Sequence, residues 1–337
     1  MIGVLYPDAY AVEETFQLLK VPWEWYDPTG DYDVVLADRN LLGRDDVPVI
    51  DLAKEDFFGK VAATLNTGLS HNHEPTVDHE IDRLRAALRE HTFLVEIPPV
   101  PWGHPYMVAL THDVDLISAR ERGWPSVGSA MYRCLRQGRM REAWRFFLAR
   151  CGTGRDPWDL FGRWKMLEEI LGVRSTFFFL PFPSKPGILA PPMRAGYYSP
   201  GDAPISELIR DGWEAGVHGI DNWASVQAGR EEMQALGLEK AGNRVHWLIR
   251  DEESWKHLDE AGYAYDSTFG YDDDVGFRAG TLQVYRPRGV GTLLELPLHI
   301  QDLGLFGKSC WAPSESGWQR TPCLALTEPE ARVLCNG

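Results

Sequence analysis

Two aspartates separated by one residue follow an apolar run in the stretch ALTHDVDL (109–116). In a strand, side chains two residues apart point to the same side, so Asp113 and Asp115 would face one place if the strand reaches that far. Neighbouring carboxylates repel each other unless a cation or strong hydrogen-bond donors offset the charge. The pair therefore predicts a divalent metal ion bound by one acid, while the other acid, held by an arginine, accepts a proton.

Two further groups of polar side chains follow apolar runs later in the chain. Residues 218–222 come after EAGV, and residues 299–302 come after LLELPL. In a barrel of parallel strands, the carboxyl ends of the strands open at one mouth. We therefore expect both groups to meet the two aspartates there.

The elements that must position these residues alternate between strand and helix after residue 98. The stretches YMVALTHDVD, VRSTFFFLP, EAGVHGID and GTLLELPLHIQD are typical of strands. Helical stretches separate them, among them DPWDLFGRWKMLEEILG, which has a proline in its first turn and ends on a glycine. Repeated units of this kind predict an α/β barrel with its chemistry at the carboxyl ends of the strands.

The first hundred residues also alternate, with IGVLY, VEETFQLLK, DVVLAD and VPVID as short strands and a helix. They predict a small α/β unit with a mainly parallel sheet. The proline-rich stretch EIPPVPWGHP (96–105) is typical of a linker. We therefore expect a small α/β domain of unknown role over residues 1–97 and a barrel domain over residues 98–337.

Composition excludes some classes of function. The chain has 337 residues and a formal net charge of -15, which argues against nucleic acid as a partner. No basic start leads into a long apolar core, and no run reaches the roughly 18 apolar residues that a membrane helix needs. We expect a cytoplasmic protein without a transmembrane segment.

One segment departs from this acidic character. Residues 120–155 carry nine arginines against two glutamates. Such a segment could contact an anionic or lipid-linked substrate, a nucleotide sugar or a membrane surface, or it could be a solvated helix face.

The motifs, taken in order, resemble those of the polysaccharide deacetylase superfamily, the NodB-homology group that includes carbohydrate esterase family 4. The likeness covers most of residues 105–334, and the D-x-D form of the first motif is similar to a cytosolic bacterial and allantoinase-like branch. The resemblance implies that Asp113 is the catalytic base and that Asp115 binds the metal. Trp247, in RVHW (244–247), matches a groove-lining aromatic, and Arg244 matches the arginine that steadies the base. Trp223, beside another motif, could also stack on a sugar.

The second family motif, H-[ST]-x-x-H, is only half matched by HGIDN (218–222). The resemblance makes His218 a metal ligand, but Asn222 stands where the second histidine is expected. An amide oxygen suits zinc less well than imidazole does, although a harder metal could accept it. Asp221 is an alternative third ligand on our own inference from the residues.

The last family motif, a strand that ends in a histidine acting as general acid, has no match in the sequence up to LTEPEARVLCNG. We therefore expect a distorted (β/α)7-type barrel without its last strand, and a chain that is incomplete at its C-terminus. His299 could supply the proton instead.

The function expected from these residues is a metal-dependent hydrolase that removes an acyl group, N-acetyl above all, from an amino sugar or a glycan precursor. The cofactor would be one divalent ion, with zinc first and cobalt, nickel or manganese as alternatives. Two other functions stay open: hydrolysis of a cyclic amide or ureide, and a degenerate barrel that binds a glycan without turnover.

Overall fold

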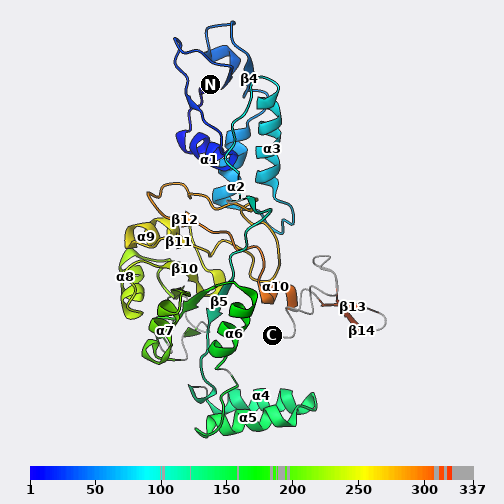
Figure 1. The fold of residues 1–337 in the computed structure, drawn as a ribbon, viewed down its shortest axis with the longest axis vertical. Coiled ribbons are helices and arrows are strands. Elements are labelled where there is room, and N and C mark those ends of the chain that lie inside the picture. Colours follow the sequence, from blue (N-terminus) through cyan, green and yellow to red (C-terminus); the bar gives the residue numbers. More distant parts are fainter. Residues whose placement is uncertain are drawn as a thin grey trace. The chain divides into compact units, whose positions relative to one another are not determined.

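The computed structural model describes residues 1–98, 100, 103–121, 123–157, 159–182, 185–186, 188, 194–195, 198–306, 311–314 and 317–320 (Figure 1). The chain forms two compact units. Unit 1 contains Met1–Tyr106, Ser267–Val290 and the described residues from Leu294 onward. Unit 2 contains Met107–Asp266 and Gly291–Leu293.

Unit 1 begins with a parallel sheet in the order β2-β1-β3-β4. Its strands are β1 (Ile2–Val4), β2 (Glu24–Trp25), β3 (Val34–Ala37) and β4 (Val49–Asp51). Its helices are α1 (Ala9–Leu19), the short η1 (Arg39–Leu41), α2 (Phe57–Thr67) and α3 (Thr76–Arg89). The side chain of Asp8 caps α1 by accepting a hydrogen bond from the Ala11 N–H. A mainly parallel α/β arrangement is what the alternating sequence predicts for this region.

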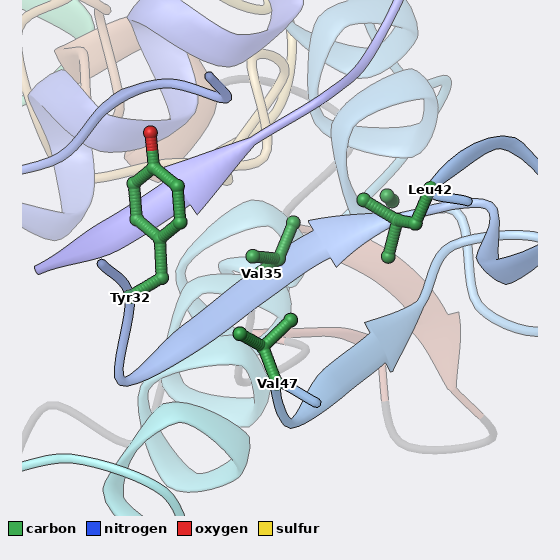
Figure 2. Packing of buried hydrophobic residues seen from close by; sticks show 5 residues of the cluster. Tyr32, Val35, Leu42 and Val47 are labelled. Atoms are coloured by element: carbon green, nitrogen blue, oxygen red, sulfur yellow. The ribbon is translucent and has the colours of Figure 1, made fainter. Parts of the chain in front are cut away.

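The core of this sheet lies on both faces of β3. Val35 and Ala37, two residues apart, point to one face and pack with Tyr32, Leu42 and Val47 (Figure 2). The intervening residues of β3 are also fully buried. A strand buried on both faces is typical of a parallel sheet covered by helices, and it explains the continuous apolar run in DVVLAD.

Later parts of the chain complete unit 1. They comprise β12 (Leu294–Glu295), α10 (Asp302–Phe306) and the antiparallel pair β13 (Trp311–Ser314) and β14 (Gly317–Arg320). The Tyr285 hydroxyl donates to the Leu65 carbonyl oxygen over 2.7 Å, and the Thr281 hydroxyl donates to Asp78 over 2.7 Å. The sequence placed every residue after 97 in the second domain, whereas the structure assigns these segments to unit 1 because they bond to α2 and α3.

Unit 2 is built on parallel strands in the order β11-β10-β9-β6-β5. Their bounds are β5 (Thr111–Val114), β6 (Thr176–Phe179), β9 (Glu214–Gly219), β10 (Gly242–Val245) and β11 (Tyr265–Asp266). Two-residue strands β7 (Lys185–Pro186) and β8 (Arg194–Ala195) pair antiparallel. The described strands form no closed sheet. The fold of unit 2 is therefore mixed α/β with a parallel sheet.

Helices connect the strands of unit 2. The α-helices are α4 (Trp124–Arg136), α5 (Met140–Arg150), α6 (Phe161–Leu171), α7 (Ile205–Arg210), α8 (Val226–Ala235) and α9 (Ser254–Ala261). The short helices are η3 (Ala119–Glu121), η4 (Pro200–Asp202) and η5 (His246–Leu248). Among the described residues, no helix combines the length and apolar character needed to cross a bilayer.

Candidate metal site

Three side chains from parallel strands of one sheet in unit 2 meet at the strand ends. Asp115 follows the last residue of β5, His218 is the penultimate residue of β9, and His246 follows the last residue of β10. One ligand atom of each lies within 4.8 Å of the others. In the part of the chain that the structure describes, this is the one group of three potential metal ligands.

The spacing of these atoms fits a divalent ion. Oδ1 of Asp115 lies 3.5 Å from Nε2 of His218 and 3.5 Å from Nδ1 of His246. Two ligands of a tetrahedral zinc ion, each bound at 2.0–2.1 Å, lie about 3.4 Å apart. The two histidine nitrogens are closer, at 2.8 Å, which is the separation of a hydrogen bond. Two imidazoles and a carboxylate are a donor set that zinc and related ions accept.

His218 is fixed in the orientation that a metal ligand needs. Its Nδ1 lies 2.8 Å from the carbonyl oxygen of Arg244, an atom that can only accept. Nδ1 therefore carries a proton, and in the neutral ring Nε2 presents its lone pair to the other two residues. Burial lowers the pKa of His218, but the carboxylates of Asp113 and Asp115 outweigh this effect, and the pKa is raised.

His246 has the opposite electrostatic character. Burial and the neighbouring charge of His218 lower the pKa of His246 to about 4, although Asp115 acts in the other direction. His246 is therefore neutral near pH 7, with a proton on one ring nitrogen and, on the other, a lone pair of the kind that an ion needs. The rings of the two histidines meet edge to face, with their centroids 4.8 Å apart.

A carboxylate–guanidinium pair lies on the same strands. Nη1 of Arg244 donates to Oδ1 of Asp113 over 3.0 Å and to the Thr111 hydroxyl over 2.7 Å. Thr111 and Asp113 are two residues apart in β5, so one guanidinium reaches both. The side chain of Arg244 is only 4% exposed and lies over the ring of Phe178, whereas that of Asp113 is 32% exposed. Arg244 is therefore fixed, and Asp113 is open to a substrate.

The backbone after His246 is strained. Trp247 and Leu248 have φ values of 66° and 51°, in the left-handed region that residues other than glycine seldom adopt. Such a residue costs about 1–3 kcal/mol when the surrounding structure imposes it. The side chain of Trp247 is 54% exposed, and its ring lies edge to face with that of His246. An exposed aromatic beside the candidate ligands is suited to stacking on a sugar ring.

Asn222 and Asp221, which the sequence offered as further ligands, are held by other partners. The Asn222 amide donates to Oδ1 of Asn243 over 2.7 Å and to the hydroxyl of Tyr263 over 3.1 Å. Asp221 accepts from the Ile188 N–H over 2.8 Å. Both side chains are buried, and the group of potential ligands that the structure brings together is Asp115, His218 and His246.

Trp223 and His299 were also candidate site residues. Trp223 is 9% exposed, and its indole N–H donates to the Ile220 carbonyl oxygen over 3.1 Å, as in a core residue. His299 belongs to unit 1, where its Nε2 lies 2.9 Å from the carbonyl oxygen of Thr281. Burial lowers the pKa of His299.

His246 is the residue that sequence reasoning missed. It follows Arg244 by two positions, just as Asp115 follows Asp113. Each strand thus carries one member of the carboxylate–guanidinium pair and, two residues later, one candidate ligand. This shared spacing on two parallel strands of one sheet, β5 and β10, was the signal that could have found it.

Comparisons with known proteins give little beyond this geometry. No family model matches the chain, and no curated protein matches it. A solved structure, described as a proposed polysaccharide deacetylase from Mycobacterium smegmatis, is 25% identical, with 61% of this chain and 64% of that chain covered. The chain thus spans less than two thirds of the length of that protein, and the TM-score is low, at 0.34.

Proposed function

We propose that the chain is a metal-dependent hydrolase that removes an N-acetyl or related acyl group from an amino sugar or a glycan precursor. The observation that carries the proposal is the grouping of Asp115, His218 and His246 beside the pair of Asp113 and Arg244. The order of these residues in the motifs, which resemble those of polysaccharide deacetylases, supports the same function. On this proposal the parallel sheet of unit 2 is part of a distorted (β/α)7-type barrel.

Asp115, His218 and His246 would hold one divalent ion, with zinc as the first candidate and cobalt, nickel or manganese as the others. When bound, the ion would polarise the substrate carbonyl and lower the pKa of a water molecule toward about 7. His218 keeps Nε2 available because its Nδ1 donates to a backbone carbonyl oxygen. Orientation by such a partner commonly matters for metal affinity by a factor of about 10–100.

Asp113 is the proposed base. Its carboxylate takes a proton from the attacking water, and Arg244 stabilises the negative charge of Asp113 and fixes its position. The protonated Asp113 can then return the proton to the leaving amine. His299 was the sequence-based candidate for this second step, but its lowered pKa favours the neutral form, which has no additional proton to give.

The test is chelator-sensitive hydrolysis. The purified chain is assayed against a panel of N-acetyl amino sugars, among them monosaccharides, oligosaccharides and nucleotide sugars, and against cyclic amides and ureides. We expect acetate release from an N-acetyl sugar that stops with chelator, returns with added metal and is lost in Asp113→Asn. His91→Ala, which changes an exposed histidine outside the site, is the matched control.

Two other outcomes distinguish the alternatives. The Asp113-x-Asp115 spacing favours cyclic amides as the second substrate class, and turnover of these compounds alone would replace the deacetylase proposal. Saturable glycan binding that survives chelation, with no turnover, would instead indicate a non-catalytic barrel.

A further inference from the structure

The arginine-rich segment forms a helical hairpin within unit 2. Helices α4 and α5 pack side by side, joined by a short turn (Figure 1). Val127, Ala130 and Cys134 of α4 are buried at helical spacing, and Ala143 and Ala149 of α5 are buried as well. The buried residues of the two helices are thus small or medium-sized, whereas several large side chains are exposed.

The end of the hairpin near the turn combines positive charge with exposed apolar side chains. We call this surface the hairpin tip, and it consists of Tyr132, Arg133, Leu135, Arg136, Arg139, Met140, Arg141, Trp144 and Arg145. Its apolar members are between 51% and 71% exposed. Spacings of four residues align Met140 with Trp144 and Arg141 with Arg145, so apolar and basic stripes run side by side on α5.

The charge of the tip is nearly uncompensated. Arg139 pairs with Glu142. Among the described residues, Arg136, Arg141 and Arg145 have no ion-pair partner within 4.0 Å, although the whole chain is strongly acidic. A solvated helix face would explain the arginines but not the exposed tryptophan, leucine and methionine between them.

We propose that the hairpin tip docks on a membrane surface that carries anionic lipids. Arginines bind the lipid phosphates, while tryptophan, tyrosine, leucine and methionine enter the boundary between headgroups and acyl chains. The large apolar side chains favour a lipid surface over nucleic acid, which would gain little from leucine and methionine. This docking is independent of the proposed hydrolase activity, because no residue of the tip belongs to the candidate metal site.

The experiment measures binding of the full chain to vesicles by sedimentation. The vesicles contain phosphatidylcholine alone or phosphatidylcholine mixed with phosphatidylglycerol. Each basic residue near an anionic surface changes partitioning by about fivefold. Arg141→Gln combined with Arg145→Gln should therefore weaken binding to the anionic vesicles by about 25-fold. Arg39→Gln combined with Lys240→Gln removes the same charge from exposed positions outside the hairpin and should leave binding nearly unchanged.

A second variant tests the apolar part. Trp144→Ser should weaken binding to anionic vesicles even at high salt, where arginine contacts are screened. Circular dichroism of each variant shows whether the hairpin stays helical. The proposal is overturned if the parent chain does not bind anionic vesicles, if the control loses as much binding as the arginine variant, or if DNA binds the tip as strongly as the vesicles do.

Discussion

Replacing Arg244 by glutamine tests the positioning of the proposed base, Asp113, separately from metal binding. The side chain of Arg244 donates to a carboxylate oxygen, that of Asp113, and to a hydroxyl, that of Thr111. A charged hydrogen bond contributes about 1.5–3 kcal/mol and a neutral one about 0.5–1.5 kcal/mol. Because the Asp113 side chain is 32% exposed, water replaces part of the first contact. We therefore expect Arg244→Gln to lower the free energy of unfolding by about 2–3 kcal/mol.

The effect on activity should be larger than the effect on stability. Asp113 loses the group that fixes its position and stabilises its charge, and general base catalysis contributes about 10²–10⁴ in rate. We expect kcat to fall by about 10² or more. Metal content should not change, because His218 bonds to the backbone carbonyl of Arg244, which the substitution retains.

The assay combines urea unfolding, kcat on the substrate identified by the panel, and metal analysis of the same preparation. Thr111→Val is the matched control, since it removes the hydroxyl bond alone and leaves the pair of Asp113 and Arg244 intact. This control should cost about 0.5–1.5 kcal/mol and reduce kcat much less. A kcat for Arg244→Gln within a few-fold of the parent value would refute the reasoning.

Three further predictions follow from other parts of unit 2. Below the raised pKa of His218, metal affinity should weaken by about tenfold for each pH unit of acidification, because the ion must then displace a proton. Calorimetry in buffers of different ionisation enthalpy measures the proton that is released. Burial raises the pKa of Asp259, but the N–H groups of residues 291–293 donate to its carboxylate and lower the pKa overall. Since the pKa of Asp259 in the folded chain lies below the unfolded value of 3.8, this stabilisation is present above pH 3.8 and is lost as the pH falls through the folded pKa. In urea unfolding, Asp259→Asn should lower the free energy of unfolding by about 1–2 kcal/mol at neutral pH and by less at pH 3. Trp247→Gly should leave stability unchanged or raised because glycine tolerates a φ of 66°, while KM rises several-fold through loss of the stacking surface; thermal unfolding and KM measure the two effects.

The parts of the site that follow from strand geometry were predictable from the sequence. Alternation along β5 places Asp113 beside Thr111, and the parallel order of β5, β9 and β10 brings His218 and Arg244 to the same edge. For Asp113, Asp115 and His218 this inference needs only a strand assignment and the rule that parallel strands end together, whereas Arg244 was expected from the resemblance to the deacetylase motifs. The catalytic and metal-binding roles of these residues remain predictions.

His246 carried a weaker signal, because only its spacing of two residues from Arg244 marks it. The left-handed backbone of Trp247 and Leu248, which follows it, could not be predicted, because neither residue type signals such a conformation. The hydrogen bonds of the Asn222 amide were equally unpredictable, because its partners, Asn243 and Tyr263, come from distant parts of the sequence that no local pattern connects to it.

The sequence predicts a small α/β region before residue 98 from its strand–helix alternation and a linker at residues 96–105. In the structure the first segment of unit 1 ends at Tyr106. The later segments were missed because they join unit 1 through contacts more than 200 residues apart in sequence, such as Tyr285 with Leu65. Single side-chain bonds of this kind leave no periodic pattern.

The metal content of the purified chain and three variants tests the central claim most directly. Mass spectrometry after incubation with zinc should find about one ion per chain in the parent and in Asn222→Ala, and little in Asp115→Ala or His246→Ala. This pattern would make His246, and not Asn222, the third ligand. Full occupancy in His246→Ala, or no bound ion in the folded parent chain, would contradict the account.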